Sequence, residues 1–281
     1  MKRLTVPALA SLIALCLAAG SIAFFNYRLS NKADDGLLSL YDVTGAFKAG
    51  GLQLINGRVG RAELELGGVR PALFKIANTE DSLFVYIFKS IEDRKKVYDG
   101  PGYDPAGRNE VVRSLFSRYS PFPRLHEARN VLVVYTPEEI PMNDAENQIF
   151  RKVADAVFTG LNNGRTLIFK GSGTHWEAQL IYRYYEYWWK DSGGRWQYEN
   201  WQTEHPVLKY KGKDLEDVGE ISYTCMAPSG GMSGHTTLDQ NGYAITGSGG
   251  SNVALTRKDD IYTVTVEWNG QKETFTLRAA P

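Results

Sequence analysis

The chain has 281 residues, and its 32 basic and 32 acidic side chains give a formal net charge of zero at pH 7. Without an excess of positive charge the protein has no general attraction for nucleic acid, so we expect no nucleic-acid partner. The length is enough for one or two domains that each bury a core.

An apolar stretch without any charged residue occupies residues 4–25. As a helix, a stretch of about 22 residues rises about 33 Å, which is enough to cross the hydrocarbon core of a bilayer. Lys2 and Arg3 precede it and favour an amino end that stays in the cytoplasm. We therefore predict a single-pass transmembrane anchor in the cell membrane at residues 1–28, a tether at residues 29–40, and an extracytoplasmic location for the rest.

A cleaved signal peptide is the alternative, because residues 21–23 (Ser-Ile-Ala) have the small-x-small pattern of a cleavage site. The apolar run of such a signal usually has about 7–15 residues, whereas this run continues into Phe24, which favours retention. Lipid attachment at Cys16 is a further alternative. The bulky Leu15 before it argues against lipidation, and we interpret Cys16 as a small apolar residue inside the helix.

Cys225 is the one cysteine outside the apolar stretch, so the exported part can form no intrachain disulfide. A cysteine-poor exported chain fits a Gram-positive cell envelope, where a domain of this size does not need disulfides. Cys225 alternates with Ile221 and Tyr223, which predicts a buried structural residue in a strand. The sequence indicates no neighbour that would activate its thiol.

Residues 41–163 predict a small α+β domain in which helices cover one face of a sheet. Capping residues followed by amphipathic spacing predict three helices, and apolar runs bounded by turn residues predict a hairpin and one fully buried strand. In chain order, the expected helices span residues 42–48, 90–98 and 143–161, with Asp42 capping the first, and the expected strands span 72–77, 83–88 and 131–135.

Residues 164–281 predict an all-β domain, which we expect to be a sandwich, so the fold class of the whole chain is α+β. From Trp176 to Tyr184 large apolar residues alternate with polar ones, as in a strand with one buried face. After Tyr184 the alternation changes phase, and we expect a β-bulge or bend near Glu186.

The register of the last hairpin can be predicted from the sequence. Asn269-Gly270 is the strongest signal for a two-residue hairpin loop. Such a loop places residues of matching chemistry opposite each other, which favours cross-strand packing. The predicted pairs are Tyr262–Leu277, Val264–Phe275, Thr265–Thr274 and Glu267–Lys272.

Catalytic motifs are incomplete in this sequence. His126-Glu127 begins like the zinc-binding motif HExxH, but Asn130 replaces the second histidine, so we interpret His126 as a loop residue. The glycine-rich residues 229–234 and 247–251 match neither the nucleophile elbow nor the phosphate-binding loop, and we expect loops there.

A metal site is also not indicated. His175 and Glu177 would share one face of a strand. His205 and His235 are not at a spacing typical of metal ligands, either from this pair or from each other. We therefore interpret these side chains as solvated or hydrogen-bonded. The sequence predicts no catalytic residue, no metal ligand and no cofactor.

All six tryptophans lie in the predicted β domain. Two of them are adjacent, so in a regular strand their rings point to opposite faces. Exposed rings on a β-sheet can stack on sugar rings or hold a protein partner. The candidate ligand or partner surface is Tyr185, Tyr187, Trp188 and Trp189; packing in the core and across strands is the alternative, which we favour.

Three segments, residues 83–94, 176–185 and 261–277, resemble those of a group of exported, membrane-anchored proteins from Gram-positive spore-forming bacteria. In that group, whose function is unassigned, an apolar amino terminus precedes a small α+β unit and a β domain that ends in a Trp-Asn-Gly hairpin. The resemblance implies export and membrane attachment, and it implies no activity and no functional residue.

These observations favour a membrane-tethered extracytoplasmic protein, without enzymatic activity, that binds an envelope protein or glycan. A cell-envelope enzyme whose site forms only in three dimensions is one alternative, and a structural tether or assembly factor is another. A cluster of His175, Glu177 and either His205 or His235 around a pocket would favour the enzyme.

Overall fold

The computed structural model describes residues 36–58, 64–98, 103–105, 114–116, 123–138, 144–245, 248–251 and 254–281. The predicted anchor and most of the predicted tether lie outside these ranges. Within them, no helix is long and apolar enough to span a membrane. Leu38–Pro281 form one compact unit with two separate sheets, and the division into domains at residues 163 and 164 stays a prediction.

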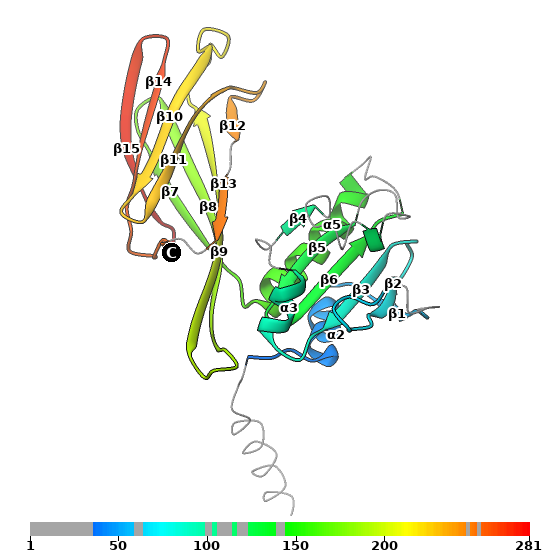
Figure 1. Ribbon diagram of the computed structural model, residues 1–281. Coiled ribbons are helices and arrows are strands. Elements are labelled where there is room, and N and C mark those ends of the chain that lie inside the picture. Colours follow the sequence, from blue (N-terminus) through cyan, green and yellow to red (C-terminus); the bar gives the residue numbers. More distant parts are fainter. Residues whose placement is uncertain are drawn as a thin grey trace, which may run out of the picture. The chain divides into compact units, whose positions relative to one another are not determined.

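The first sheet has six antiparallel strands in the order β1-β2-β3-β6-β5-β4 (Figure 1). Its strands are β1 (Leu54–Asn56), β2 (Ala72–Ile76), β3 (Ser82–Ile87), β4 (Tyr103–Pro105), β5 (Arg124–Ala128) and β6 (Val131–Thr136). The three predicted strands are confirmed as β2, β3 and β6. The other three were missed, because β1 and β4 are short and β5 follows a stretch rich in glycine and proline.

The predicted helices are present as α2 (Leu40–Ala49), α3 (Ile91–Val97) and α5 (Asp144–Asp155), the last of which continues as the π-helix η3 (Ala156–Leu161). Ser90 caps α3 through its hydroxyl, which accepts a hydrogen bond from the Asp93 N–H at 3.0 Å. The predicted cap of α2 was wrong. Ser39 is the cap, and its side chain and that of Asp42 accept reciprocal hydrogen bonds from each other's N–H groups.

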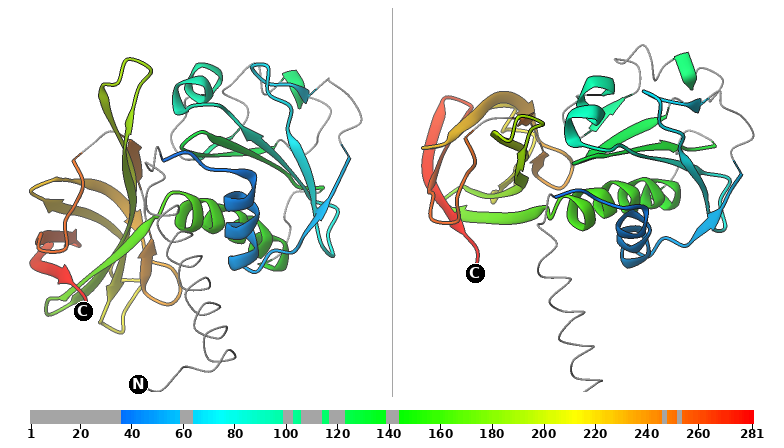
Figure 2. Two further views of the ribbon diagram at one scale, coloured as in Figure 1. Left: turned by 90° about the horizontal axis from the view of Figure 1, so that it is seen from below. Right: turned by 60° about the horizontal axis from the view of Figure 1, so that its bottom comes forward.

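Both faces of the first sheet are covered, whereas the sequence predicted only that helices cover one of them. Figure 2 shows α2 and the continuous α5–η3 helix on one face, where Val43 and Phe47 of α2 are buried. The opposite face packs against Tyr98 after α3, Leu66 and Phe116. Every residue of β6 is buried because neither of its faces meets solvent.

The second sheet has nine strands in the order β11-β10-β14-β15-β7-β8-β9-β12, with β13 also paired to β9. It curls into a nearly closed sheet around one core (Figure 2), which confirms the all-β prediction. Its strands are β7 (Arg165–Ser172), β8 (Trp176–Lys190), β9 (Trp196–Tyr210), β10 (Glu220–Ala227), β11 (Gly230–Thr237), β12 (Tyr243–Ile245), β13 (Ser248–Ser251), β14 (Tyr262–Trp268) and β15 (Gln271–Ala279).

The predicted register of the last hairpin is confirmed at all four pairs. Asn269 and Gly270 form its loop with φ angles of 41° and 72°, as a type I′ turn requires. The predicted alternation in β8 is also confirmed, since every second residue from Trp176 to Tyr184 is buried. Cys225 is buried, and burial raises the pKa of its thiol to about 12, so the thiol stays protonated.

The two glycine-rich segments were expected to be loops, and this expectation was wrong. The first contains the start of β11, and the second contains β13. A Cβ atom added to Gly231 would lie 2.2 Å from the Cys225 carbonyl oxygen on β10. Glycine is therefore used here because two backbones approach closely within a sheet.

Candidate functional site

The β8–β9 hairpin is longer than its neighbouring strands. Strand β7 pairs with β8 only as far as Tyr184, and β13 pairs with β9 from Trp201 onward. Between Tyr185 and Asn200 the two strands therefore pair with each other alone within the described residues. We call residues 185–201 the hairpin extension; it projects beyond the rest of the second sheet (Figure 1).

The bulge expected near Glu186 is absent. The pairing of β8 with β9 is continuous from Trp176 opposite Tyr210 to Lys190 opposite Trp196. The alternation of large and polar residues changes phase because the other face of β8 becomes the buried one. Up to Tyr184 the large residues point into the core of the second sheet, and in the extension the opposite face is covered instead.

The covered side of the extension is its inner face: Tyr185, Tyr187, Trp189, Gln197, Glu199 and Trp201, which share one face by their cross-strand pairing. The rings of Tyr185 and Trp201 stack with centroids 5.6 Å apart, and each also contacts Phe158 of η3. Burial raises the pKa values of Tyr185 and Tyr187, so both phenols stay protonated.

A buried cluster of charged groups joins the inner face to the first sheet. The Arg94 guanidinium, which is fully buried, forms an ion pair with Glu127 of β5 and lies 3.7 Å from a carboxylate oxygen of Glu199. Arg94 also donates hydrogen bonds to the carbonyl oxygens of Arg129 (2.8 Å) and Tyr98 (3.0 Å).

The Glu199 carboxylate is held from three directions. Lys95 forms an ion pair with one of its oxygens, Tyr187 donates a hydrogen bond to the other, and Arg94 approaches the same oxygen. Each charge in this cluster thus has an opposite charge nearby, which offsets the free energy needed to bury it. We conclude that the cluster fixes the hairpin extension against α3.

The loop at the tip of the extension is also ordered by hydrogen bonds. The Asp191 carboxylate accepts from the N–H groups of Gly193 and Arg195 and from the Arg195 side chain. These hydrogen bonds hold the pKa of Asp191 below its usual value, and the bond from the Arg195 N–H has the largest effect. The Ser192 N–H donates to Glu92 of α3 at 3.1 Å, so the tip too is attached to α3.

The opposite side of the extension is its outer face: Glu186, Trp188, Lys190, Trp196, Tyr198 and Asn200. Trp188 and Trp196 are 62% and 64% exposed, although both lie within a regular hairpin. The ring of Trp188 packs against that of Tyr198 at 4.7 Å, and the Lys190 ammonium lies 4.9 Å from the centroid of the Trp196 ring. The outer face therefore presents aromatic rings next to charged groups.

Of the four residues predicted to form a ligand surface, Trp188 lies on the outer face and the other three lie on the inner face. Trp189 and Tyr185 are buried and Tyr187 is half-buried. Their rings are thus covered by the protein, whereas Trp188 is open to solvent. Trp196 and Tyr198 were missed as neighbours of Trp188. The glycine-containing loop at 191–195 was the signal that would have placed them on the opposing strand.

His126 was expected in a loop, and this was wrong. It lies in β5 and is buried beside a cavity of about 100 Å³ that is also lined by Phe158, Asn162 and Trp201. The Asn162 amide donates to the Glu127 carbonyl at 2.9 Å, and its side-chain oxygen has no hydrogen-bond partner among the described residues. A cavity of this size has room for roughly three water molecules, and a water there would supply that partner.

The burial of His126 predicts a dependence of stability on pH. Burial lowers the pKa of His126 to about 4, with a smaller contribution from Arg124, whereas an unfolded histidine has a pKa of about 6.5. Between these two pKa values the imidazole of the unfolded chain binds a proton, whereas that of the folded chain stays neutral. We expect the contribution of neutral His126 to stability to be complete above pH 6.5 and to fall by roughly 3 kcal/mol as the pH drops to about 4.

Urea unfolding at several pH values measures this loss. Carboxylates titrate over part of the same range, so the control is His126→Gln, which is neutral at every pH. The expected result is that the unfolding free energy of the unchanged protein, minus that of His126→Gln, decreases from pH 7 to pH 4. A difference that stays constant over this range would contradict a neutral, buried His126.

A second buried polar network lies inside the curled sheet. The Tyr262 hydroxyl donates to Glu204 at 3.0 Å and lies 2.6 Å from the Thr256 hydroxyl, and the Thr256 N–H donates to Tyr182 at 2.9 Å. Burial raises the pKa of Glu204, which the Tyr262 hydrogen bond partly offsets. These groups satisfy one another, as expected for a polar network that stabilises a core.

The residues considered for a metal site are not brought together. His175 lies near the Trp268 ring and Glu273, and His205 and His235 are exposed on β9 and β11. Among the residues that the structure describes, no group of three or more histidine, cysteine or acidic side chains could hold a metal ion.

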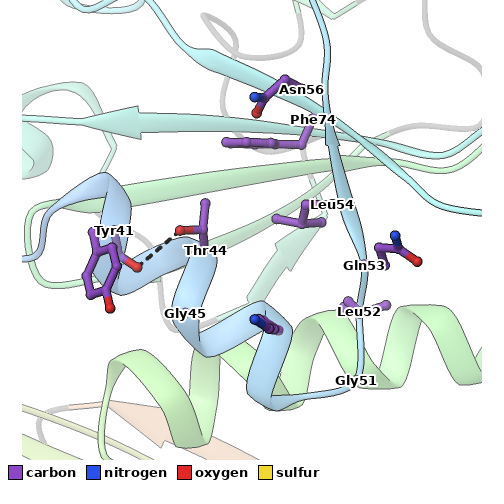
Figure 3. A pocket seen from close by; sticks show the side chains of 10 residues that line it. Tyr41, Thr44, Gly45, Gly51, Leu52, Gln53, Leu54, Asn56 and Phe74 are labelled. Carbon is purple, nitrogen blue, oxygen red and sulfur yellow. Dashed lines mark hydrogen bonds between the residues drawn. The ribbon is translucent and has the colours of Figure 1, made fainter.

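A groove of about 660 Å³ lies between α2 and the adjoining strands β1 and β2 (Figure 3). Tyr41, Thr44, Gly45 and Lys48 line it from one side of α2. Leu54 and Asn56 of β1 and Phe74 of β2 line it from the sheet. No sequence pattern predicted this groove, because β1 has only three residues and was not itself predicted.

Comparison with known proteins adds no functional assignment. Neither models of protein families nor curated proteins match this chain.

Proposed function

We propose that the protein is a non-enzymatic binding module, tethered to the cell membrane by one amino-terminal helix, that binds a glycan of the cell envelope on the outer face of the hairpin extension. The β domain, with a sandwich-like packing of its curled sheet, is the scaffold for this face. The tether rests on the apolar residues 4–25 and the basic residues before them.

The exposure of Trp188 and Trp196 carries this proposal. Large aromatic rings favour burial by on the order of 1.5–3 kcal/mol each, so two that remain exposed together are available to a ligand. Sugar rings stack on aromatic faces, and their hydroxyls form hydrogen bonds with polar groups at the edges. Lys190 and Glu186 provide such groups beside the rings.

The rigidity of the extension also supports binding. The cluster around Arg94 and Glu199 and the contacts at the tip hold the inner face in place. The outer face therefore needs little ordering when a ligand binds, which reduces the entropic cost of binding.

The test is binding of the full-length protein, in lipid nanodiscs, to purified cell-wall glycan. We expect Trp188→Ala and Trp196→Ala each to weaken binding roughly 10- to 150-fold, the equivalent of burying one ring. The matched control is Ile245→Ala, which removes an exposed apolar side chain from β12 of the same sheet. Equal binding by all four proteins would exclude the outer face as the glycan site.

Two further readouts complete this experiment. Capture of an envelope protein instead of glycan, with the same loss in both tryptophan variants, would assign the outer face to a protein partner. Protease applied to cells without a wall should digest the bulk of the chain if it is extracytoplasmic. A protected carboxyl terminus, or a full-length form released into the medium, would contradict the tether.

A further inference from the structure

The groove between α2 and β1 ends at an open strand edge. β1 is the terminal strand of the first sheet, and within the described ranges β2 is its sole partner. The Gly57 N–H donates to the Leu73 carbonyl, and the Ala77 N–H donates to the Gln53 carbonyl. In an antiparallel pair the bonded residues alternate, so the main-chain groups of Leu54 and Asn56 point away from β2.

The wall and floor of the groove are apolar. Phe74 and Leu52 are buried there, and the half-buried Leu54 shares its face of β1 with Asn56. On the side of the groove opposite β1, Gly45 lies in the exposed middle turn of α2. A Cβ atom added to Gly45 would meet no other atom within 4 Å, so the space beside this turn is open. A volume of about 660 Å³ is in the range of ligand-binding sites, roughly 300–1,000 Å³.

The charge of the groove is positive. Lys48 is its one charged lining residue, and no described residue forms an ion pair with it. The carbonyl end of α2, where Lys48 lies, itself has a partial negative charge. An acidic group of an occupant would therefore be attracted by the Lys48 side chain and not by the end of the helix.

We propose that this groove binds an extended peptide segment of a partner protein by strand addition to β1. The main chain of the peptide pairs with the outward N–H and C=O groups of Leu54 and Asn56. An apolar side chain of the peptide enters the space between Phe74 and Gly45, and a carboxylate near it reaches Lys48. This site is separate from the outer face of the hairpin extension and does not depend on it.

The test uses a phage-displayed library of random heptapeptides, selected on the full-length protein in nanodiscs. We expect enriched peptides that combine an apolar and an acidic residue at a fixed spacing. Asn56→Pro removes an outward N–H without removing a bond to β2, and Gly45→Leu fills the groove. Each should weaken binding of the enriched peptides at least tenfold, and Lys48→Gln should abolish the preference for the acidic residue.

Matched controls separate the site from general effects. Asn56→Thr keeps the N–H group, and Ala49→Leu adds the same side chain to α2 at a position that does not line the groove; both should bind as the unchanged protein does. Trp188→Ala should also bind normally, so failure of the glycan proposal leaves this one intact.

Three results would overturn the proposal. They are an absence of enriched peptides, enriched peptides that bind all variants equally, and a dimer of the protein that Asn56→Pro or Gly45→Leu dissociates. The last result would assign the groove to a second copy of this chain.

Discussion

Replacing Arg94 with methionine is expected to lower the free energy of unfolding by about 3–5 kcal/mol, because removal of one partner leaves a buried charge uncompensated. Arg94 is fully buried, and its ion-pair partner Glu127 is 8% exposed. The substitution also removes the hydrogen bonds to the carbonyl oxygens of Arg129 and Tyr98. Glu199 keeps Lys95 as an ion-pair partner, so the main loss is at Glu127.

Urea unfolding of the full-length protein measures this effect. The control is Arg70→Met, which removes an exposed arginine that lies 3.5 Å from Glu65; we expect a loss of at most about 1 kcal/mol. The double variant Arg94→Met/Glu127→Met should be more stable than Arg94→Met alone, because it buries no unpaired carboxylate. If Arg94→Met lowers the free energy of unfolding no more than Arg70→Met does, the cluster does not hold the extension.

The two adjacent tryptophans of β8 should respond very differently to truncation. Trp189 is 8% exposed, and we expect Trp189→Ala to lower the free energy of unfolding by about 3–5 kcal/mol. Its indole N–H has no hydrogen-bond partner among the described residues, so this loss is one of packing. Trp188 has a cross-strand contact with Tyr198, which predicts a loss of only about 0.2–1 kcal/mol for Trp188→Ala.

Thermal unfolding of both variants, together with quenching of tryptophan fluorescence by iodide, checks this difference. Iodide should reach Trp188 and Trp196, and replacing both by phenylalanine should remove most of the quenching. Trp176, which is fully buried, is the inaccessible reference. Strong destabilisation by both Trp188→Ala and Trp189→Ala, with no ring accessible to iodide, would make the outer face part of a core and remove the basis of the proposed function.

Local signals were sufficient for much of the fold. A serine followed by an aspartate three residues later placed the start of α3, since the cap and its partner are neighbours in the chain. Asn269-Gly270 determined the register of the last hairpin, because a two-residue loop leaves one possible pairing. The alternation of large and polar residues determined which face of β8 points inward as far as Tyr184.

The candidate site depended on contacts between distant residues. The change of phase after Tyr184 was visible in the sequence, and a bulge was the wrong explanation for it. The hairpin stays regular, and its inner face is buried because Arg94 and Phe158, both far from it in the chain, cover it. A sequence pattern reveals that a face is apolar, and it cannot reveal which segment will cover that face.

The sequence by itself determined where the three helices and the last hairpin form, because caps, turns and alternation act between residues a few positions apart. It also determined that large rings point to both faces of β8 at Trp188 and Trp189. The tertiary structure alone decided that Trp189 is covered and Trp188 is open, and that β1 has a free edge beside α2. Both outcomes depend on which segments meet in space, since burial and strand pairing are properties of the packed chain.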